Sequence, residues 1–363
     1  MLVPAVRETS PRTCDPILYK PDEAGSKRVM TPFRIVAIGG GTGLSTLLHG
    51  LKRYALEPRE VEITAIVTVT DDGGSSGRLR REFDVLPPGD IRNCMVALSE
   101  DEALLSKLFQ YRFLEGRGLK GHSFGNLFLT ALTNLTGDFV QAVKVSSEVL
   151  ASLGRIYPAT NANVVLEAEL ENGSIVKGET KIGKSRSRVR RIRLQPRRCK
   201  PLPETLAAIE DADLITLGPG SLFTSVIPNL LVEGIAPAIQ RSPALKAYYV
   251  NLMWQPGETI GFRASDHVSA IHLHAGMQLI DVAVVNTRSI TARQRRRYAA
   301  EKVRSVLNDV DRLAEMGLQV VATDLLASGD SVRHDPRGSA DVALQLAKRG
   351  HTARRRVRIL GER

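Results

Sequence analysis

The sequence predicts an α/β protein with a three-layer, doubly wound, mostly parallel sheet. Apolar runs rich in β-branched residues alternate with segments of helical periodicity, which is typical of parallel βα units. Three of the runs end directly in glycine loops, as strands do at the carboxyl edge of such a sheet. A stretch at about 160–197 switches to a period of two and predicts a small antiparallel β insert. The expected architecture is Rossmann-like.

The first predicted strand and its turn lie in residues 33–46. An apolar run ends at four glycines within Gly39–Gly43, and helical apolar spacing begins at Leu44. A strand, glycine turn and helix in succession bring backbone N–H groups and a helix N-terminus to a phosphate. The pattern is neither the dinucleotide fingerprint, since the sixth position is Leu44, nor a P-loop, since no Lys-Ser/Thr pair follows. A phosphate cradle is predicted, and a tight turn without a ligand is the alternative.

The second strand, residues 61–70, runs straight into the acidic loop Asp71–Gly77. Adjacent carboxylates repel each other, so Asp71 and Asp72 are costly at a strand end unless a cation, hydroxyls or amides face them. They are predicted either to hold a divalent metal on a phosphate or to accept hydrogen bonds from ribose hydroxyls. A solvated Asp-Gly turn is the alternative.

The third strand, residues 212–217, is followed by a loop with the same features, Gly218–Ser225. Parallel strands present their carboxyl ends at one edge, where open α/β sheets bind ligands. The three loops are therefore predicted to meet at one edge of the sheet.

The other segments complete this alternation. Helices are predicted after Pro87–Asn93 and from Gly121–Leu127, and further helices at about 138–152, 203–209 and 293–313. An Asn172-Gly173 turn marks a hairpin within the insert. Later strands are predicted at 248–253, 281–286 and 319–323. Residues 33–330 are the expected nucleotide-binding domain, between a disordered leader (1–32) and a basic, disordered tail (331–363) that is dispensable for ligand binding.

Composition excludes several classes of protein. The chain has 363 residues, 43% of them hydrophobic, yet no apolar run approaches the roughly 20 residues that cross a membrane. Met1–Thr13 lacks the apolar core of a secretory signal, and three distant cysteines show no metal-ligand spacing. We therefore expect a cytoplasmic protein without membrane insertion.

The net charge of +11 is concentrated in Lys184–Lys200 and Leu346–Arg363. The first of these segments includes Arg188–Leu194, which has the pattern of an edge strand guarded by arginines. No aromatic residues are interleaved for base stacking. We expect no specific nucleic-acid binding, and the sequence leaves open whether the chain forms a homo-oligomer.

Taken together, the motifs resemble those of the bacterial gluconeogenesis factor family, relatives of the 2-phospho-L-lactate transferases of deazaflavin cofactor synthesis. The resemblance covers about Phe33 to Leu326. The motifs that carry it are Gly39–Ser45, Asp71–Gly77, Pro87–Arg92, Gly121–Leu127, Gly218–Ser225 with Pro228–Leu230, Gln255–Thr259 and Ala264–His267.

The resemblance implies a cytoplasmic protein needed for cell shape during growth on gluconeogenic carbon sources, with a UDP-sugar such as UDP-N-acetylglucosamine as its ligand. In the related transferases, aspartates hold a divalent metal, and Asp71 and Asp72 occupy the place of that acidic pair. The residues expected to contact the ligand are Gly39, Gly40, Gly41, Thr42, Gly43, Asp71, Asp72, Ser75, Ser76, Asn126, Gly218, Pro219, Gly220, Ser221, Thr224, Asn229 and Phe262.

Two positions depart from the family pattern. Trp254 stands where Thr is more usual, and Phe262 stands where Tyr is expected, which removes a hydroxyl although the ring can still pack on a base or sugar. Asp90 and Arg92 either pair with each other or belong to the site. Asn126 either caps a helix or binds the ligand.

Four residues near the end of the motif series have simpler interpretations. His267, His272 and His274 are interpreted as structural residues, because their spacing does not match a helical metal pair. Asp266 is interpreted as the N-cap of the helix that follows it.

Two functions remain open at this stage. The first is a nucleotide-sugar-binding regulator without chemistry, which is favoured because a deazaflavin acceptor needs a roomy aromatic slot and only 5% of residues are aromatic. The second is a phospholactyl-type transferase that uses Asp71 and Asp72 with Mg²⁺ as catalytic, metal-binding residues. No metal is assigned if the protein is a regulator. A dinucleotide oxidoreductase is disfavoured because the fingerprint is absent.

Overall fold

The computed structural model describes residues 31–361, apart from 57, 101–103 and 186. Nearly all of the predicted leader lies outside the described residues. In the described part of the chain, no single helix has both the length and the apolar content to cross a membrane. The bent pair Leu222–Leu230 and Ile235–Arg241 meets that test of length and composition only when its two parts are joined.

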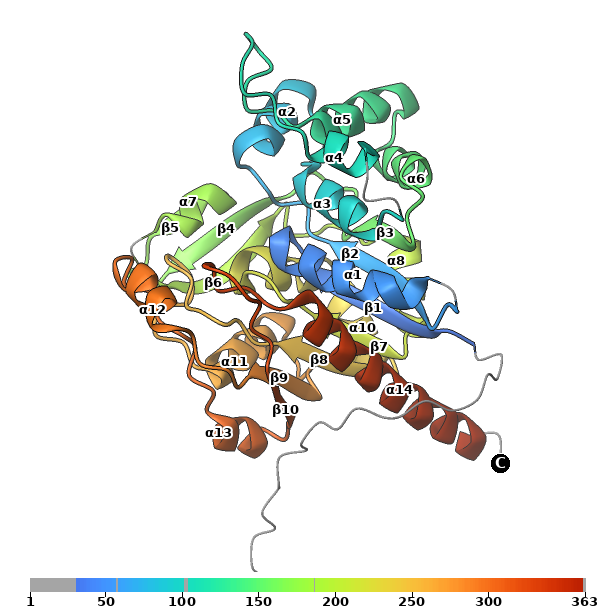
Figure 1. Ribbon diagram of the computed structural model, residues 1–363, viewed down its shortest axis with the longest axis vertical. Coiled ribbons are helices and arrows are strands. Elements are labelled where there is room, and N and C mark those ends of the chain that lie inside the picture. The colour runs from blue at the N-terminus through green and yellow to red at the C-terminus, as the bar shows by residue number, and fades with distance from the viewer. Residues whose placement is uncertain (1–30, 57, 101–103, 186, 362–363) are drawn as a thin grey trace, which may run out of the picture.

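A seven-stranded parallel sheet forms the centre of the molecule, in the order β10-β9-β8-β7-β1-β2-β3 (Figure 1). Its strands are β1 (Phe33–Gly39), β2 (Val61–Val67), β3 (Gly154–Pro158), β7 (Leu214–Leu217), β8 (Leu245–Tyr249), β9 (Val282–Asn286) and β10 (Gln319–Thr323). The chain proceeds outward from β1 in one direction and from β7 in the other. The strand order therefore reverses between β1 and β7, and ligands of doubly wound sheets bind outside the carboxyl ends at such a point.

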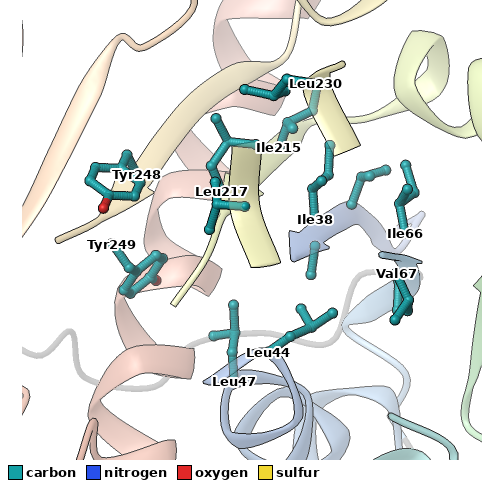
Figure 2. Packing of buried hydrophobic residues seen from close by; sticks show 14 of the residues in the cluster. Ile38, Leu44, Leu47, Ile66, Val67, Ile215, Leu217, Leu230, Tyr248 and Tyr249 are labelled. Atoms are coloured by element: carbon teal, nitrogen blue, oxygen red, sulfur yellow. The ribbon is translucent and has the colours of Figure 1, made fainter. Parts of the chain in front are cut away.

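Helices cover both faces of this sheet, so the predicted three-layer fold is confirmed. One group packs together on one face: α1 (Gly41–Ala55), α3 (Gly89–Leu98) and α14 (Pro336–Gly361). The other group comprises α8 (Pro203–Asp211), α9 (Ile227–Leu230), α10 (Ile235–Arg241) and α11 (Ala264–Ala275). Figure 2 shows Leu44 and Leu47 of α1 on one side of Leu217, with Leu230 of α9 on the other. A strand that is covered by helices on both faces needs apolar side chains on both faces, which is why β7 is almost entirely apolar.

A helical lobe stands beside β2 and β3, at the top of Figure 1. It contains α2 (Gly74–Phe83), α4 (Leu104–Gln110), α5 (Phe124–Thr136) and α6 (Phe139–Val149). The helices predicted after Pro87–Asn93, from Gly121–Leu127 and at about 138–152 are α3, α5 and α6. Side chains cap the N-termini of α5 and α6. Ser123 accepts a hydrogen bond from the Asn126 N–H, and Asp138 accepts one from the Val140 N–H.

The predicted antiparallel insert is also present, as a three-stranded sheet in the order β5-β4-β6. Its elements are β4 (Val165–Leu170), β5 (Ile175–Lys177), the short helix α7 (Glu179–Gly183) and β6 (Val189–Gln195). Strand β6 lies at an edge, with Ile192 and Leu194 buried and Arg190 and Arg191 exposed. The predicted arginine-guarded edge strand is confirmed.

The helix predicted over residues 293–313 is two shorter helices, α12 (Ala292–Ala299) and α13 (Val310–Glu315). Between them the chain is extended, and Ser305 and Leu307 form β-bridges with Met253 and Arg263. Pairing with the loop after β8 therefore interrupts a segment that has helical composition.

The prediction of a disordered tail at 331–363 is wrong. Residues 336–361 form α14, which packs on α1 and on β1, β7 and β8. Its buried face is narrow and consists largely of alanine and leucine: Ala340, Ala343, Leu344, Leu346 and Ala347. Arginines dominate the composition and obscured this apolar stripe in the sequence.

Candidate functional site

Two glycine loops meet at the switch point, at the carboxyl ends of β1 and β7. Gly41 has φ = +61°, a left-handed conformation that favours glycine. A Cβ on Gly43 would lie 2.4 Å from the carbonyl oxygen of Pro219, so glycine at this position lets the second loop cross the first turn of α1. Gly218 also has a positive φ, +75°, at the end of β7. The remaining predicted loop, Asp71–Gly77, follows β2, which lies parallel and next to β1, so all three loops lie at the carboxyl edge of the sheet as predicted.

A cavity of about 270 Å³ opens over these loops. One end is formed by backbone and small polar groups: Gly40, Gly41, Thr42, Gly43, Thr46, Pro219, Gly220, Ser221 and Ser225. The other end is formed by larger side chains: Asn251, Leu252, Met253, Trp254, Gln255, Tyr298, Val332, Arg333 and His334. The cavity thus joins a helix N-terminus, suited to an anion, to a wall suited to a ring system.

Hydrogen bonds order the middle of this cavity. Gln255 donates through Nε2 to Ser221 Oγ (2.6 Å), and Asn251 donates through Nδ2 to Gln255 Oε1 (2.9 Å). Asn251 is 8% exposed, and its Oδ1 has no hydrogen-bond partner in the described part of the chain. A buried acceptor without a partner is costly, so a ligand donor at this point would relieve the cost.

Of the two aromatic residues Trp254 and Phe262, only Trp254 lines the cavity. Trp254 lines the cavity and donates from Nε1 to the Phe262 carbonyl (2.9 Å). The Phe262 ring packs edge-on against Phe223 and His267 and does not line the cavity. Phe262 therefore positions Trp254 through this backbone hydrogen bond, and Trp254 is the one of the two whose ring can contact a ligand in the cavity.

The adjacent Asp71 and Asp72 carboxylates point to different neighbours. Asp71 accepts from the Gly73 N–H (2.8 Å), and its other oxygen lies close to Gly89 at the start of α3. Asp72 accepts from both the N–H (2.9 Å) and the hydroxyl (2.6 Å) of Thr180 in α7. Asp72 thus attaches the antiparallel insert to the edge of the sheet, while Asp71 lies beside the start of α3, and neither aspartate lines the cavity.

Three further carboxyls make the interior of this edge acidic: Asp90 and Glu179 lie near Asp71, and Glu258 lies near Glu179. Burial, followed by the charge of Asp71, raises the pKa of Asp90 to about 6, although the Gly41 N–H bonded to it acts in the opposite direction. Burial raises the pKa of Glu258 to about 7. Burial and the neighbouring carboxylates raise the pKa of Glu179 to about 9, and its Oε2 is buried without a partner among the described residues. Glu179 therefore carries a proton at neutral pH.

The predicted contact residues Ser75, Ser76 and Asn126 are buried and do not line the cavity. Ser75 shares a hydrogen bond with His122 Nδ1 (2.9 Å), and Asn126 donates to Ser76 Oγ (3.3 Å). Asn126 is the third residue after the Ser123 cap, so its side chain is not the cap itself, and its Oδ1 has no partner in the described chain.

Thr224 and Asn229 lie beneath the second loop. Thr224 donates to Glu258 (3.4 Å), and Asn229, which is fully buried, donates to the carbonyls of Ser225 (2.7 Å) and Gly39 (3.3 Å). In this structure they hold the two loops together from below the cavity.

The interpretation of the histidines as structural agrees with their hydrogen bonds. His267 bonds the Arg263 carbonyl, and His274 accepts the Ile192 N–H and so joins α11 to β6. The interpretation of Asp266 as the N-cap is wrong, because the N-cap is Arg263. Asp266 is the third residue of the helix and accepts the Arg263 N–H (2.7 Å) in a capping box. In the described residues, no three His, Cys, Asp or Glu side chains have the arrangement of a metal site.

Several residues of the site escaped the sequence analysis. Glu179 lies in the insert, more than a hundred positions from Asp71 along the chain, and no local pattern marked it. Tyr298, Arg333 and His334 come from segments assigned to a helix and to a tail. Glu258 lies within the Gln255–Thr259 motif, so that motif was the one available signal.

Comparison with known proteins identifies the family. The model of the family described as 2-phospho-L-lactate transferase CofD matches residues 35–326. The chain belongs to the CofD family. The gluconeogenesis factor of Bacillus subtilis (strain 168) is 49% identical over 316 residues, covering 87% of this chain and 98% of the relative. The putative gluconeogenesis factor of Aquifex aeolicus (strain VF5) is 49% identical over 322 residues, covering 87% and 97%.

A solved structure has the same fold. A crystal structure of a UPF0052 family member from Bacillus halodurans is 47% identical and has a TM-score of 0.83. The match covers 87% of this chain and all of that chain. The resemblance to gluconeogenesis factors seen in the motifs is thus confirmed over nearly the whole described body.

Proposed function

We propose that this CofD family member is a gluconeogenesis factor that binds a UDP-sugar, with UDP-N-acetylglucosamine as the first candidate. The observation that carries the proposal is the cavity at the switch point, which joins a glycine-lined helix N-terminus to an aromatic wall. The names of the relatives support the gluconeogenesis factor assignment.

The diphosphate would lie on the first turn of α1. Gly41 already gives its N–H to Asp90, so the unbonded amides available in that turn are those of Thr42 and Gly43. Ser221, whose hydroxyl accepts from Gln255, faces the same space from the second loop. Amides and a helix N-terminus bind a diphosphate without a basic side chain.

The uracil or sugar ring would lie against Trp254 and Tyr298. The Oδ1 of Asn251 offers an acceptor for a ring N–H or a sugar hydroxyl, and Arg333 stands at the mouth of the cavity. Binding would inform the cell about its supply of nucleotide sugar, which fits a cytoplasmic regulator of cell shape during gluconeogenic growth.

Isothermal titration tests the ligand. UDP-N-acetylglucosamine, GDP and NAD are titrated with and without Mg²⁺, and UDP-N-acetylglucosamine should bind in both conditions. Asn251→Ala should weaken it about tenfold, as loss of one hydrogen bond does. Asn161→Ala, an exposed residue outside the cavity, is the matched control. Preference for GDP or NAD would overturn the proposal.

A transferase of the phospholactyl type is the second candidate, and one observation favours it. Asp71 and Asp90 are close enough for the charge of one to raise the pKa of the other, so a cation between them would be stabilised. Carboxylate oxygens suit Mg²⁺, and Mg²⁺ would neutralise a diphosphate leaving group. Asp72 is committed to Thr180, so Asp90 replaces it as the partner of Asp71. A Mg²⁺ requirement for binding, with consumption of the nucleotide, would select this candidate.

A further inference from the structure

A second cavity adjoins the first along α1. It measures about 490 Å³ and lies between α1, α3 and α4, with Pro336 at the start of α14 closing one side. Thr42 and Thr46 of α1 line both cavities. The two spaces therefore meet along one turn of this helix.

The charge of this second cavity is entirely positive among the described residues that line it. Arg92 of α3, Lys107 of α4 and Arg112 contribute cationic groups, and none of the described lining residues is Asp or Glu. Lys107 is exposed and has no ion pair in the described part of the chain. Asn93 accepts from Arg92 Nη2 (2.5 Å) through its Oδ1, which leaves its two amide hydrogens to be donated elsewhere.

Arg92 gives this cavity a fixed cationic wall. It is 9% exposed and donates from Nη1 to Ser123 Oγ (2.5 Å), and its Nε has no partner in the described chain. Burial, then the neighbouring Arg112, lowers the pKa of Arg92, while Asp90 and Asp71 act in the opposite direction. Two guanidinium groups close enough to repel each other, one of them buried, favour an anion between them.

The cavity is larger than a bare phosphate requires and has an apolar part. Val96 and Ala97 of α3 contribute aliphatic surface beside the cations. Ligand pockets for small organic molecules have volumes of about 300–1,000 Å³. The space therefore has room for a phosphate together with a small organic group.

We propose that the cavity between α1, α3 and α4 is a second anion site that binds a phosphomonoester. Arg92 and Arg112 contact the phosphate, Lys107 supplies a third charge, and Val96 contacts the organic group. The site has its own ligand and does not depend on the identity of the molecule in the first cavity. Because the two cavities share Thr42 and Thr46, occupancy of one alters the surroundings of the other.

Titration calorimetry with inorganic phosphate and with phenyl phosphate tests the site in the full-length chain. The Gly41→Val variant is used alongside the wild-type chain, since it removes phosphate binding at the glycine loop. Both probes should bind to Gly41→Val, with phenyl phosphate the tighter of the two. Adding Lys107→Ala should weaken both about tenfold, as loss of a charge-assisted contact does. Lys144→Ala, an exposed lysine on α6, is the matched control and should change nothing.

The outcomes separate this site from the first cavity. Lys107→Ala alone should leave the affinity for UDP-N-acetylglucosamine within about twofold, because Lys107 does not line that cavity. Phosphate binding that disappears in Gly41→Val would place the anion in the glycine loop and overturn the inference. Binding that survives Lys107→Ala and Arg112→Ala unchanged would also overturn it. Failure of UDP-N-acetylglucosamine to bind would refute the proposed function alone.

Discussion

The first turn of α1 separates two regions of opposite character. Toward the insert lie the carboxyl groups of Asp71, Asp90, Glu179 and Glu258. Burial raises the pKa of Asp90 to about 6, of Glu258 to about 7 and of Glu179 to about 9, so Glu179 holds its proton at neutral pH. Toward α4 lie Arg92, Lys107 and Arg112. Arg92 donates to Ser123 and Asn93 and does not form an ion pair with Asp90, its neighbour two residues away. Among the described residues, the acidic and cationic groups at this edge therefore lie on separate sides and do not form ion pairs with one another.

The difference shows two ways of tolerating charge near a ligand. The acidic region lowers its charge by holding protons, because burial disfavours carboxylates. The cationic region keeps its charge, because guanidinium groups do not lose protons at neutral pH. An anion is therefore favoured over α1 and toward α4, and the charges of Asp71 and Asp90 oppose it toward the insert.

The largest effect is expected from removing the segment that adjoins both cavities. Deletion of 331–363 removes three residues of the first cavity, Pro336 of the second, and the buried face of α14. It should lower the free energy of unfolding by at least about 3 kcal/mol, from lost apolar burial, and abolish ligand binding. Urea unfolding and calorimetry measure both. Deletion of 355–363 leaves the buried residues Ala340, Ala343, Leu344, Leu346 and Ala347 in place and is the control. A 31–330 fragment that binds the ligand as tightly as the full chain would contradict this expectation.

The glycine loop should matter next. Gly41→Val places a β-branched residue at φ = +61°, and it should weaken UDP-N-acetylglucosamine at least about 100-fold while costing about 1–2 kcal/mol of stability. Gly137→Val, at φ = +69° with no neighbour within 4 Å, imposes the same strain away from the site. Equal binding losses in the two variants would show that strain alone is responsible.

Protonation of Glu179 gives a pH dependence of stability. A carboxyl whose pKa is raised to about 9 in the folded protein keeps a proton that the unfolded chain loses at its ordinary value of 4.5. Stability therefore falls as the pH rises between these values, by about 1 kcal/mol per pH unit. Between pH 7 and 8.5 Asp90, with a pKa of about 6, contributes little, and Glu258, with a pKa of about 7, contributes only at the lower end, so most of the slope comes from Glu179.

Glu179→Gln should remove most of this slope, which urea unfolding at pH 7 and 8.5 measures. Glu171→Gln, an exposed acid in the same insert, should leave it unchanged. A slope that persists in Glu179→Gln would mean that another group holds the proton.

The smallest expected effect is the difference in ligand binding between the Asp71→Asn and Asp72→Asn variants. Asp71→Asn should weaken UDP-sugar binding by about 1–3 kcal/mol if its carboxylate accepts bonds from ligand hydroxyls. Asp72→Asn should act less on binding and more on the insert, because its partner is Thr180. Thr180→Val should reproduce the Asp72→Asn result. Calorimetry in EDTA and in Mg²⁺ completes the comparison, and metal-dependent binding lost with Asp71 would favour the transferase.

The sequence by itself determined the doubly wound sheet, the glycine loops at its carboxyl edge and the family. These follow from local patterns, since β-branched runs and glycines report the backbone of their own segment. It also identified Asp71 as a residue of this edge, although it treated Asp71 and Asp72 as a pair. Adjacent side chains of an extended segment point in opposite directions, and the position of Thr180 decided which aspartate would turn toward the insert.

Only the tertiary structure decided which distant residues complete the site. Glu179 reaches the edge because the insert folds back onto the Asp72 loop, and Arg333 reaches the first cavity because α14 packs on α1. Burial and the proximity of like charges, which set the protonation of Glu179, do not exist in the extended chain. They arise when segments far apart in sequence are packed together, because electrostatic interaction and desolvation depend on distance in space and not on distance along the chain.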